Sequence, residues 1–399
     1  MIARLRHETC ATALVLARAA ADNQSAMRAH LTQMFQAGIA ACHPRTALPP
    51  HLPKAERAIV LAIGKAAGEM AKVAEARYAA VSGVAVVPHG VTADLKRIAL
   101  LHAGHPIPDE ASVAAAERLL ALAGDARPDD LVLVLLSGGA SALACAPIED
   151  LTLAGKQAVT RELLRSGAPI GDINCVRRHL SRIKGGRLRA TLTLAISDVI
   201  GNRPEDIGSG PTVADPTTIA DARAILDRHG LAAPLSESAK RVEGDFRIVA
   251  GAADAMAAAA REAERLGYKP ILLGECSGEA REVGRAHASI ARESQPGTAL
   301  ISGGELTVTV TGSGRGGPNL EYALAAAGQR DIVGLAADTD GLDGTSGAVG
   351  AFFDDHAEGA AEALAANDSA AWFAASSALF VTGPTGTNVN DLRIILVAP

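Results

Sequence analysis

The sequence predicts a doubly wound α/β fold, in which helices cover both faces of parallel sheets. Short aliphatic runs alternate with helical patterns along all 399 residues, which is the order of elements in such folds. The run Leu131–Leu136 is aliphatic throughout, as expected for a strand that is buried on both faces. Several such runs end in glycine, serine or aspartate, at the edge where α/β sheets bind their ligands.

The composition indicates a globular enzyme of two or three domains. The chain is 48% hydrophobic and 21% charged, and its net charge is −6 without a basic block, so we expect no nucleic acid as a partner. Five scattered cysteines without a CxxC pair are typical of thiols in a reducing cytoplasm. No apolar stretch has the length of a membrane span, so we expect no membrane as a partner either.

Residues 1–40 predict two amphipathic helices, with Asp22–Ser25 between them. The apolar stretch Ala11–Ala17 imitates the core of a short signal peptide. However, Glu8 precedes this stretch and helical spacing continues through Leu31. We therefore interpret the segment as helical and expect a cytoplasmic location.

A proline-rich connector at 43–53 leads into the first domain, in which strands and helices alternate. Asp109 can accept hydrogen bonds at the start of the helix that follows it. Strands are predicted over residues 58–63, 84–87, 98–102, 131–136 and 191–196. Helices are predicted over residues 69–81, 110–122, 153–166 and 172–189 and, after a Gly/Pro/Asp-rich loop at 201–218, up to His229.

The second half of the chain repeats this alternation. Leu306–Val310 alternates apolar residues with threonine, which predicts a half-exposed antiparallel strand. Because proline and charged residues interrupt the pattern between His229 and Phe246, we expect domains at 1–235 and 236–399. Further strands are predicted over residues 246–250, 271–273, 299–302, 332–336 and 392–397, and helices over 253–266, 279–294 and 319–329.

Glycine-rich or polar loops follow five of the predicted strands. They are Gly64-Lys65, Ser137-Gly138-Gly139, Ser197-Asp198, Gly303-Gly304-Glu305 and Asp338-Thr339-Asp340. Gly138 and Gly139, with the hydroxyls of Ser137 and Ser141, predict a cradle for phosphate or carboxylate, although the loop is not a Walker A motif. Together the loops can supply N–H donors, a cation and carboxylates to one crevice, which favours phosphoryl transfer.

Three basic residues are candidates for binding an anion. Lys65 stands between a strand end and a helix start, where it can reach an anion or lie solvated on the surface. Arg177 and Lys184 are seven residues apart on the predicted helix 172–189 and would share one face. That face is either part of a binding site or an ordinary charged surface.

Acidic residues at two strand ends are candidates for binding a metal. Asp198 can hold a divalent cation or cap the segment that follows. Asp338, Asp340 and Asp343 form a loose acidic loop without EF-hand spacing. This pattern favours Mg²⁺ assisted by phosphate over a calcium site built by protein alone.

The segment Gly312–Gly317 matches GxGxxG, the fingerprint of dinucleotide-binding folds. Three observations weaken a nicotinamide interpretation. The preceding strand alternates with threonine, Pro318 suits the first position of a helix, and Arg315 places a charge inside the loop. A reductase that uses NAD(P)H therefore stays an alternative.

The chain resembles the class II glycerate 2-kinases, a family with a DUF4147 domain followed by a MOFRL domain. The matching runs are Ala62–Ala67, Gly104–Asp109, Leu136–Leu143, His179–Leu188, Ser197–Val199, Gly208–Thr212, Ser302–Glu305, Gly314–Gly317, Thr339–Gly341 and Gly386–Asp391. The resemblance implies two Rossmann-like domains with an active-site cleft between them. It also implies phosphorylation of the 2-hydroxyl of D-glycerate by ATP with Mg²⁺, and some members of the family carry the label hydroxypyruvate reductase.

The resemblance and the loops together give our candidate site residues. As catalytic residues we expect Lys65, which matches a catalytic lysine of the family, with Arg315 and Asp198. Asp198 and Asp340 are expected to bind the metal. Substrate and phosphates are expected at Ser137, Gly138, Gly139, Ser141, Asn174, Arg177, Lys184, Ser209, Gly303, Gly304, Glu305, Gly316, Gly317, Asn319, Thr387, Asn388 and Asn390.

The sequence departs from the family pattern in two places. Asn202 stands where the family has an aspartate, and Pro318 and Leu320 stand where it has arginine and glutamine. These departures bear on substrate choice and on activity. Beside a glycerate kinase, which we expect to form a homodimer, the alternatives are an NAD(P)H-dependent hydroxypyruvate reductase and a ligand-binding protein without turnover.

Overall fold

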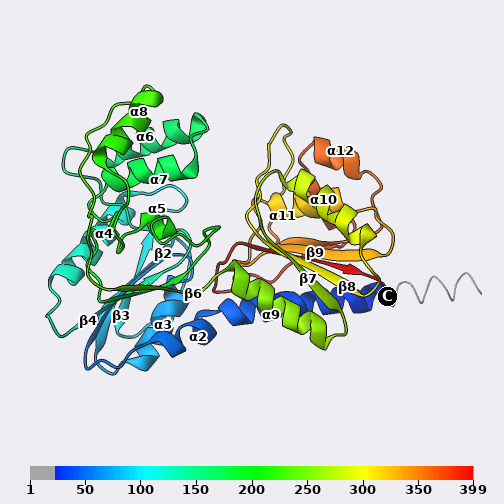
Figure 1. Ribbon diagram of the computed structural model, residues 1–399, viewed down its shortest axis with the longest axis horizontal. Helices are drawn as coiled ribbons and strands as arrows, with labels where there is room; N and C mark the ends of the chain where they lie inside the picture. Colours follow the sequence, from blue (N-terminus) through cyan, green and yellow to red (C-terminus); the bar gives the residue numbers. More distant parts are fainter. Residues whose placement is uncertain (1–22, 399) are drawn as a thin grey trace, which may run out of the picture. The chain divides into compact units, whose positions relative to one another are not determined.

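The computed structural model describes residues 23–398, which form two compact α/β units (Figure 1). The first unit contains residues 41–251 and 386–389. The second unit contains residues 23–40, 252–385 and 390–398. The predicted α/β class is therefore confirmed, whereas the active-site cleft expected between the domains stays a prediction.

The first unit is built on a sheet of six parallel strands with the order β3-β2-β1-β4-β5-β6. The strands are β1 Ala58–Ile63, β2 Val81–Pro88, β3 Ile98–Ala103, β4 Leu131–Leu136, β5 Leu192–Ile196 and β6 Asp245–Ala250. This is the strand order of dinucleotide-binding folds, and it reverses between β1 and β4. Both of these central strands are buried at every residue, as their aliphatic runs predict.

The edge strand β6 belongs to this first sheet, since it pairs with β5. We had expected residues 246–250 to open the second domain, after a boundary near residue 235. The contacts instead change unit between Gly251 and Ala252. The interruption between His229 and Phe246 is thus an irregular loop within the first unit.

Helices of the first unit form two groups. The sheet packs with α4 around one apolar core, while α6, α7 and α8 surround a separate small core of their own (Figure 1). At the start of α4, Asp109 accepts a hydrogen bond from the Ser112 N–H at 2.9 Å, which confirms the predicted cap. The helices are α2 Pro44–Ala47, α3 Ala67–Arg77, α4 Glu110–Gly124, α5 Ala140–Leu143, α6 Leu153–Arg165, α7 Ile170–His179 and α8 Ile219–Arg228, with 3₁₀ turns at Pro49–His51 and Ile207–Ser209.

The helix predicted over 172–189 was wrong in its C-terminal half. The observed α7 ends at His179, and Gly185 and Gly186 adopt left-handed backbone angles. A glycine takes these angles at no steric cost, whereas a continuing helix cannot contain them. Lys184 therefore lies in a turn and does not share a helical face with Arg177.

The second unit is built on a mixed sheet with the order β11-β10-β9-β12-β8-β7. Only β7 and β8 are parallel neighbours, and every other pair is antiparallel. The expectation of a second doubly wound parallel sheet was therefore wrong in its pairing. The strands are β7 Lys269–Cys276, β8 Thr298–Gly304, β9 Ile332–Asp338, β10 Gly350–Phe353, β11 Leu379–Phe380 and β12 Asp391–Val397.

Helices cover both faces of this second sheet (Figure 1). One face packs on a helix over residues 23–42 and on α9, and the other face packs on α10 to α13. Gly38 lets the helix over 23–42 approach closely, because a Cβ there would lie 2.7 Å from Leu392 Cδ2 and 3.2 Å from the Ala255 carbonyl oxygen. The remaining helices are α9 Ala252–Arg265, α10 Ala280–Glu293, α11 Pro318–Ala326, α12 Ala360–Ala365 and α13 Ser369–Ala375.

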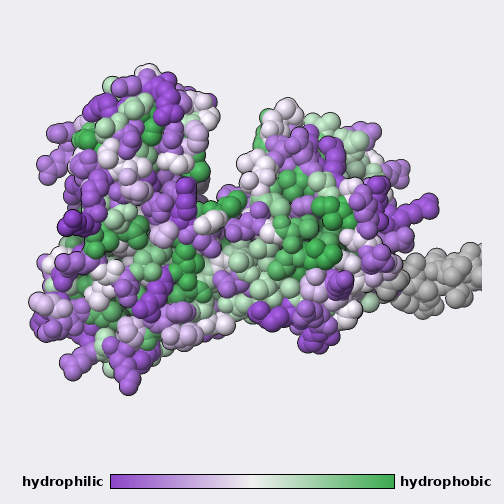
Figure 2. Space-filling view, viewed as in Figure 1, coloured by the Kyte–Doolittle hydropathy of each residue, from purple (hydrophilic) through white to green (hydrophobic). Residues whose placement is uncertain are grey.

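The strand expected over Leu306–Val310 is absent from the described structure, where only Thr307 forms an isolated bridge to Glu279. The alternating threonines instead line an exposed loop. By contrast, β10, β11, α12 and α13 were not predicted. Figure 2 shows apolar surface over the part of this unit where β7 and α10 lie, and the exposed apolar side chains of these elements are Ile271, Leu272 and Ile290.

The N-terminal prediction is tested only in part. Of the two helices expected within residues 1–40, the portion at 1–22 lies outside the described residues, and residues 23–42 form one helix. No helix among the described residues is both long enough and apolar enough to span a membrane. Of the five cysteines, the four within residues 23–398 (Cys42, Cys145, Cys175 and Cys276) are free thiols.

Candidate active site

The loops after β1 and β4 are joined at the point where the strand order of the first sheet reverses. The Lys65 N–H donates to the Gly138 carbonyl at 2.8 Å, and the Ala66 N–H donates to Ser137 Oγ at 3.0 Å. Lys65 is thus held directly beside the glycine loop. This is the position at which sheets of this topology bind ligands.

The two glycines of the loop are required by close packing. A Cβ on Gly138 would collide with the carboxylate of Asp198 and the amide of Asn388. Gly139 has a φ of 83°, and a Cβ there would lie 2.8 Å from the ring of His105 and 3.6 Å from Lys65 Cγ. The loop therefore brings Lys65, Asp198 and His105 around one short backbone segment.

Residues from the C-terminal part of the chain complete this region. The segment Gly386–Val389 belongs to the first unit. Thr387 Oγ1 donates to the Cys42 carbonyl at 2.8 Å, and Asn388 Nδ2 lies 3.4 Å from Asp198 Oδ2. The structure thus brings the predicted residues Thr387 and Asn388 to the same end of the sheet as Lys65 and Asp198.

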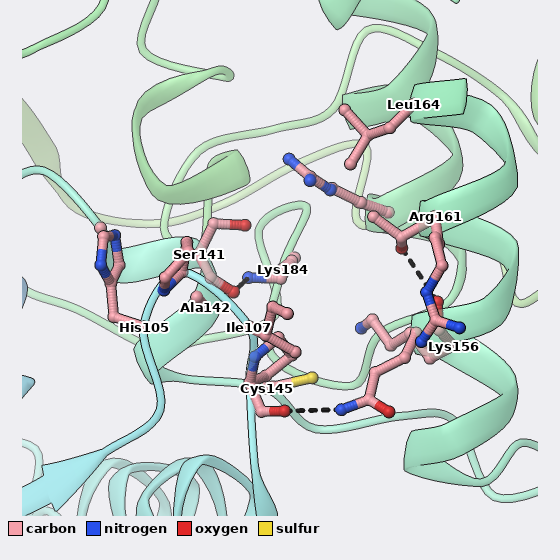
Figure 3. Close-up of a pocket in the computed structure, with 15 residues that line it drawn as sticks. His105, Ile107, Ser141, Ala142, Cys145, Lys156, Arg161, Leu164 and Lys184 are labelled. Atoms are coloured by element: carbon pink, nitrogen blue, oxygen red, sulfur yellow. Dashed lines mark hydrogen bonds between the residues drawn. The ribbon is translucent and has the colours of Figure 1, made fainter. Parts of the chain in front are cut away.

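A pocket of about 340 Å³ opens beside the glycine loop (Figure 3). In Figure 3 the helix that carries Lys156, Arg161 and Leu164 stands on one side of the pocket, and His105 and Ser141 lie on the other. Four of the lining residues are Lys or Arg, and none is Asp or Glu. The lining consists of His105, Pro106, Ile107, Pro108, Gly139, Ser141, Ala142, Cys145, Lys156, Gln157, Thr160, Arg161, Leu164, Arg177 and Lys184.

The two lysines of this pocket are buried, with exposures of 4% for Lys156 and 2% for Lys184. The pKa of Lys156 is lowered to about 8, mainly by burial and in smaller part by the charges of nearby Arg177 and Arg187. Burial also lowers the pKa of Lys184 well below its ordinary value, as does the charge of Lys156. The pocket thus concentrates cationic groups that are poorly solvated, which favours an anionic ligand.

Lys156→Met should stabilise the fold, because it removes a buried cation. A lysine whose pKa falls on folding destabilises the native state below that pKa, and this effect disappears as the pH rises towards the unfolded value. We expect the unfolding free energy to rise by about 1–3 kcal/mol at pH 7 and by less at pH 10. Urea unfolding at both pH values measures the change. Arg165→Met, at an exposed arginine of the same helix, is the control, and an equal gain in both variants would contradict the idea.

Four predicted residues lie in or behind the wall of the pocket. Ser141 Oγ and Ser209 Oγ are 2.9 Å apart. Asn174 donates to Asp206 at 3.0 Å and accepts from Arg177 at 3.3 Å. Ser141 and Arg177 line the pocket, while Asn174 and Ser209 are buried behind them. The latter two position their neighbours in the structure, and their direct contact with a ligand stays a prediction.

In the second unit, predicted residues meet around a buried ion pair between Asp391 and Arg393. Arg393 donates to the carbonyl oxygens of Gly303 at 2.9 Å and Gly304 at 3.3 Å. Asn319 is 1% exposed and donates to Asp391 at 2.6 Å. This network fixes the end of β8 against β12 and the start of α11.

Asp343 caps the N-terminus of α11. Its carboxylate accepts from the Asn319 and Leu320 N–H groups, both at 3.0 Å. A dinucleotide-binding loop would offer this helix end to a pyrophosphate, but here a carboxylate of the protein takes the place. Since no strand of the described residues directly precedes Gly312–Gly317 either, this loop lacks the strand–loop–helix arrangement of the dinucleotide fingerprint, and its geometry does not favour the nicotinamide interpretation of the motif.

Asp343 also gives the second unit a predicted pH dependence. Burial raises its pKa to about 7. Below the unfolded pKa of about 4, this carboxyl is protonated in both states and does not reduce the free energy of unfolding. As the pH rises towards 7, the unfolded state releases this proton more readily than the folded state, so the free energy of unfolding falls. Asp343→Asn should therefore gain about 1–3 kcal/mol relative to the parent between pH 4.5 and pH 8. Urea unfolding at the two pH values is the measurement, with exposed Asp355→Asn as control, and a difference that does not change with pH would contradict it.

Arg315 lies exposed in the glycine loop that precedes α11. Its guanidinium donates to the Thr345 carbonyl at 3.0 Å, and its backbone N–H donates to the Asp368 carboxylate at 3.1 Å. Arg315 does not pair with Glu321 of the following helix, whose carboxylate instead accepts from Arg281 at 2.8 Å. Gly316 and Gly317 allow this packing, since a Cβ on them would meet Ser369 and Asp343 respectively.

The remaining candidates lie at strand ends of the second unit. Glu305 is exposed after β8. Asp340 accepts from the Leu342 N–H at 2.9 Å, and the Asn390 carbonyl accepts from Thr339 Oγ1 at 2.6 Å. No group of three or more His, Cys, Asp or Glu side chains suited to a metal occurs in residues 23–398. Mg²⁺ usually takes one or two carboxylates together with phosphate oxygens, so Asp198 and Asp340 stay predictions as metal ligands.

Sequence reasoning missed Lys156, Arg161 and His105 as lining residues of the pocket. A signal was present for Lys156. It shares the buried stripe of α6 with Val159 and Leu163, and a lysine in an apolar stripe is unusual unless it has a function or a partner. His105 stood within a family run but was not singled out.

Two family models match the chain. The model of the Domain of unknown function (DUF4147) matches residues 30–243, just over half of the chain, and the model of the MOFRL family matches residues 298–391. The chain belongs to this DUF4147–MOFRL family. The family assignment made from the motifs is thereby confirmed.

Similar proteins in this family include named kinases. A glycerate 2-kinase of Pyrococcus horikoshii is 39% identical, over 85% of this chain and 87% of its own length. A D-glycerate 2-kinase of Thermotoga maritima is 36% identical, over 92% of this chain and 97% of its own. A relative from Agrobacterium vitis, 42% identical over 94% of this chain and 95% of its own, carries the provisional name hydroxypyruvate reductase.

A solved structure is also similar. The crystal structure of a glycerate kinase from Thermotoga maritima superposes with a TM-score of 0.86 at 35% identity. The match covers 94% of this chain and all of that one. The family therefore shares this fold along almost the whole chain.

Proposed function

We propose that the protein is an ATP-dependent kinase that phosphorylates the 2-hydroxyl of D-glycerate and produces 2-phosphoglycerate. One observation carries the proposal: Lys65 and the glycine loop meet at the switch point of the first sheet, beside a basic pocket. Phosphoryl transfer needs cations and N–H donors more than covalent chemistry. The similar kinases support the same reaction.

Each group has a defined task in this reaction. Basic residues of the pocket bind the carboxylate of glycerate and hold its 2-hydroxyl near the glycine loop. Lys65 offsets negative charge as it develops on the transferred phosphoryl group. Arg315 supplies a further cation from the second unit.

ATP and Mg²⁺ are the cofactors of the proposed reaction. Mg²⁺ neutralises phosphate charge when it is bound. The carboxylate oxygens of Asp198, at the end of β5, are of the hard type that this ion prefers, so the residues present fit it. Gly138 and Gly139 suit the phosphates, because neither residue carries a side chain of its own. We also propose that the protein works in the cytoplasm and forms a homodimer.

A single assay tests the proposal against its alternatives. Purified protein is given D-glycerate with ATP and Mg²⁺, and separately hydroxypyruvate with NADH or NADPH. We expect ADP and 2-phosphoglycerate in the first reaction and no cofactor oxidation in the second. Oxidation of NADH without ADP formation would overturn the proposal. Glycerate binding without either turnover would favour a ligand-binding protein.

A further inference from the structure

The basic pocket beside the glycine loop holds more positive charge than the carboxylate of glycerate can offset. Lys156, Arg161, Arg177 and Lys184 line it, and no acidic side chain does. Among the described residues, neither lysine forms an ion pair. Their hydrogen bonds run to backbone carbonyl oxygens, from Lys156 Nζ to Leu180 at 3.1 Å and from Lys184 Nζ to Ser141 at 2.7 Å and Ala144 at 3.3 Å.

These hydrogen bonds hold each ammonium in place without neutralising it. An ammonium has three N–H donors. Lys156 uses one on a carbonyl and Lys184 uses two, so together they retain three donors for which no described residue provides an acceptor. A ligand oxygen between the two side chains can accept these hydrogen bonds.

The size and lining of the pocket also exceed the needs of a three-carbon acid. Its volume of about 340 Å³ lies within the range of ligand pockets, which begins near ~300 Å³. Ile107, Ala142 and Leu164 supply an apolar wall. Water displaced from that wall strengthens the electrostatic interaction of the lysines with a bound anion.

We propose that this pocket binds a small phosphorylated carboxylic acid, with Lys156 and Lys184 shared between its charged groups, in preference to the unphosphorylated acid. The proposal deepens the proposed function and rests on it for the choice of ligands. A phosphorylated acid carries two or three negative charges at neutral pH, and so offsets more of the four cationic side chains of the lining than the single charge of glycerate does. The pocket then favours the product of the reaction over its substrate and makes product release a determinant of turnover.

Binding of such an anion should take up protons from the solvent. Other groups that face the lysines are Cys145 after α5, Arg161 on α6, Arg177 on α7, Arg187 after α7 and His105. The arginines repel an added proton, whereas an anion in the pocket attracts one. A lysine that is partly deprotonated in the empty pocket at pH 8 therefore becomes protonated when the anion enters.

Isothermal titration calorimetry of the intact protein tests the proposal, with 2-phosphoglycerate, D-glycerate and inorganic phosphate as probes. Titrations at pH 8 in two buffers of different ionisation enthalpy give the number of protons taken up. We expect 2-phosphoglycerate to bind at least ~10-fold more tightly than D-glycerate, with net proton uptake. Equal affinities, or binding without proton uptake, would overturn the proposal.

A variant of Lys156 tests whether the buried lysines cause the preference for 2-phosphoglycerate and the proton uptake. Lys156→Met should weaken 2-phosphoglycerate at least ~10-fold, weaken D-glycerate less, and reduce proton uptake. Arg165→Met, an exposed arginine on the same helix, should change neither. An unaltered preference in a folded Lys156→Met protein would also overturn the proposal. The kinase assay tests the proposed function separately from this inference. Proton-coupled binding of 2-phosphoglycerate without ADP formation would support this inference and contradict the proposed function.

Discussion

Lys65→Ala is expected to lower kcat by about 100-fold or more, with a smaller change in KM. Lys65 follows β1 directly, and its backbone is bound to the Gly138 carbonyl. The side chain therefore starts beside the loop that would hold the phosphates. Because charge on the transferred group develops in the transition state, losing this cation should affect kcat more than ground-state binding.

Steady-state kinetics with D-glycerate and ATP measure this effect. Lys72→Ala is a matched control, since Lys72 lies on α3 of the same unit and is half-exposed beside Glu69. It should leave both constants unchanged. A change confined to KM in the Lys65 variant would assign this residue to substrate binding instead.

Arg315→Ala is expected to reduce kcat/KM by at least ~100-fold, equivalent to about 2.7 kcal/mol, with little change in Tm. Among the described residues, the guanidinium donates a hydrogen bond to the Thr345 carbonyl and forms no ion pair, so its removal leaves no buried carboxylate unpaired. Pro318 begins α11, at the position where the family pattern of the sequence analysis would place an arginine. The loop therefore contains no second cation that could replace Arg315.

The same kinetic assay and a thermal melt test this expectation together. Arg285→Ala, at an exposed arginine of α10, serves as control and should behave as the parent. Normal kinetics in a folded Arg315→Ala protein would move the cationic role to Arg177 or Lys184. A large fall in Tm would instead indicate that Arg315 stabilises the loop.

The parts of the fold that could be predicted are those that local sequence determines. The aliphatic runs of β1 and β4 have the predicted bounds to the residue, because a strand buried on both faces has no polar position. Asp109 was predicted as a cap, since capping depends only on neighbouring residues. For the same reason, the loops that follow β1, β4 and β5 could be predicted at one edge of the first sheet.

The parts that failed depend on distant contacts. Strand β10 pairs with β11, which lies about thirty residues further along the chain, and no local pattern determines that pairing. The end of α7 was missed because charged residues after His179 continue a helical pattern, although Gly185 and Gly186 break it. Lys184 lines the pocket because it lies in that turn. It was predicted to bind an anion on the assumption that it shares a helical face with Arg177, and that assumption was wrong.

The path of the chain has a consequence for how the protein is made. Residues 23–40 pack on the second unit, the chain then builds most of the first unit, and Gly386–Val389 returns to it before β12 enters the second sheet. On the ribosome, the first helix is synthesised long before the strands that it covers. Its apolar side chains Met27, Leu31, Met34 and Phe35 must therefore wait, exposed or shielded by a chaperone, until those strands emerge.

The C-terminal residues, which are synthesised last, are needed to complete the fold of both units. A nascent chain that stops before residue 386 lacks both Asn388 beside Asp198 and β12, which lies between β8 and β9. Such a fragment can form neither the Asn388–Asp198 contact of the first unit nor the complete sheet of the second unit. Synthesis that ends early is therefore expected to yield an incompletely folded chain that is prone to degradation.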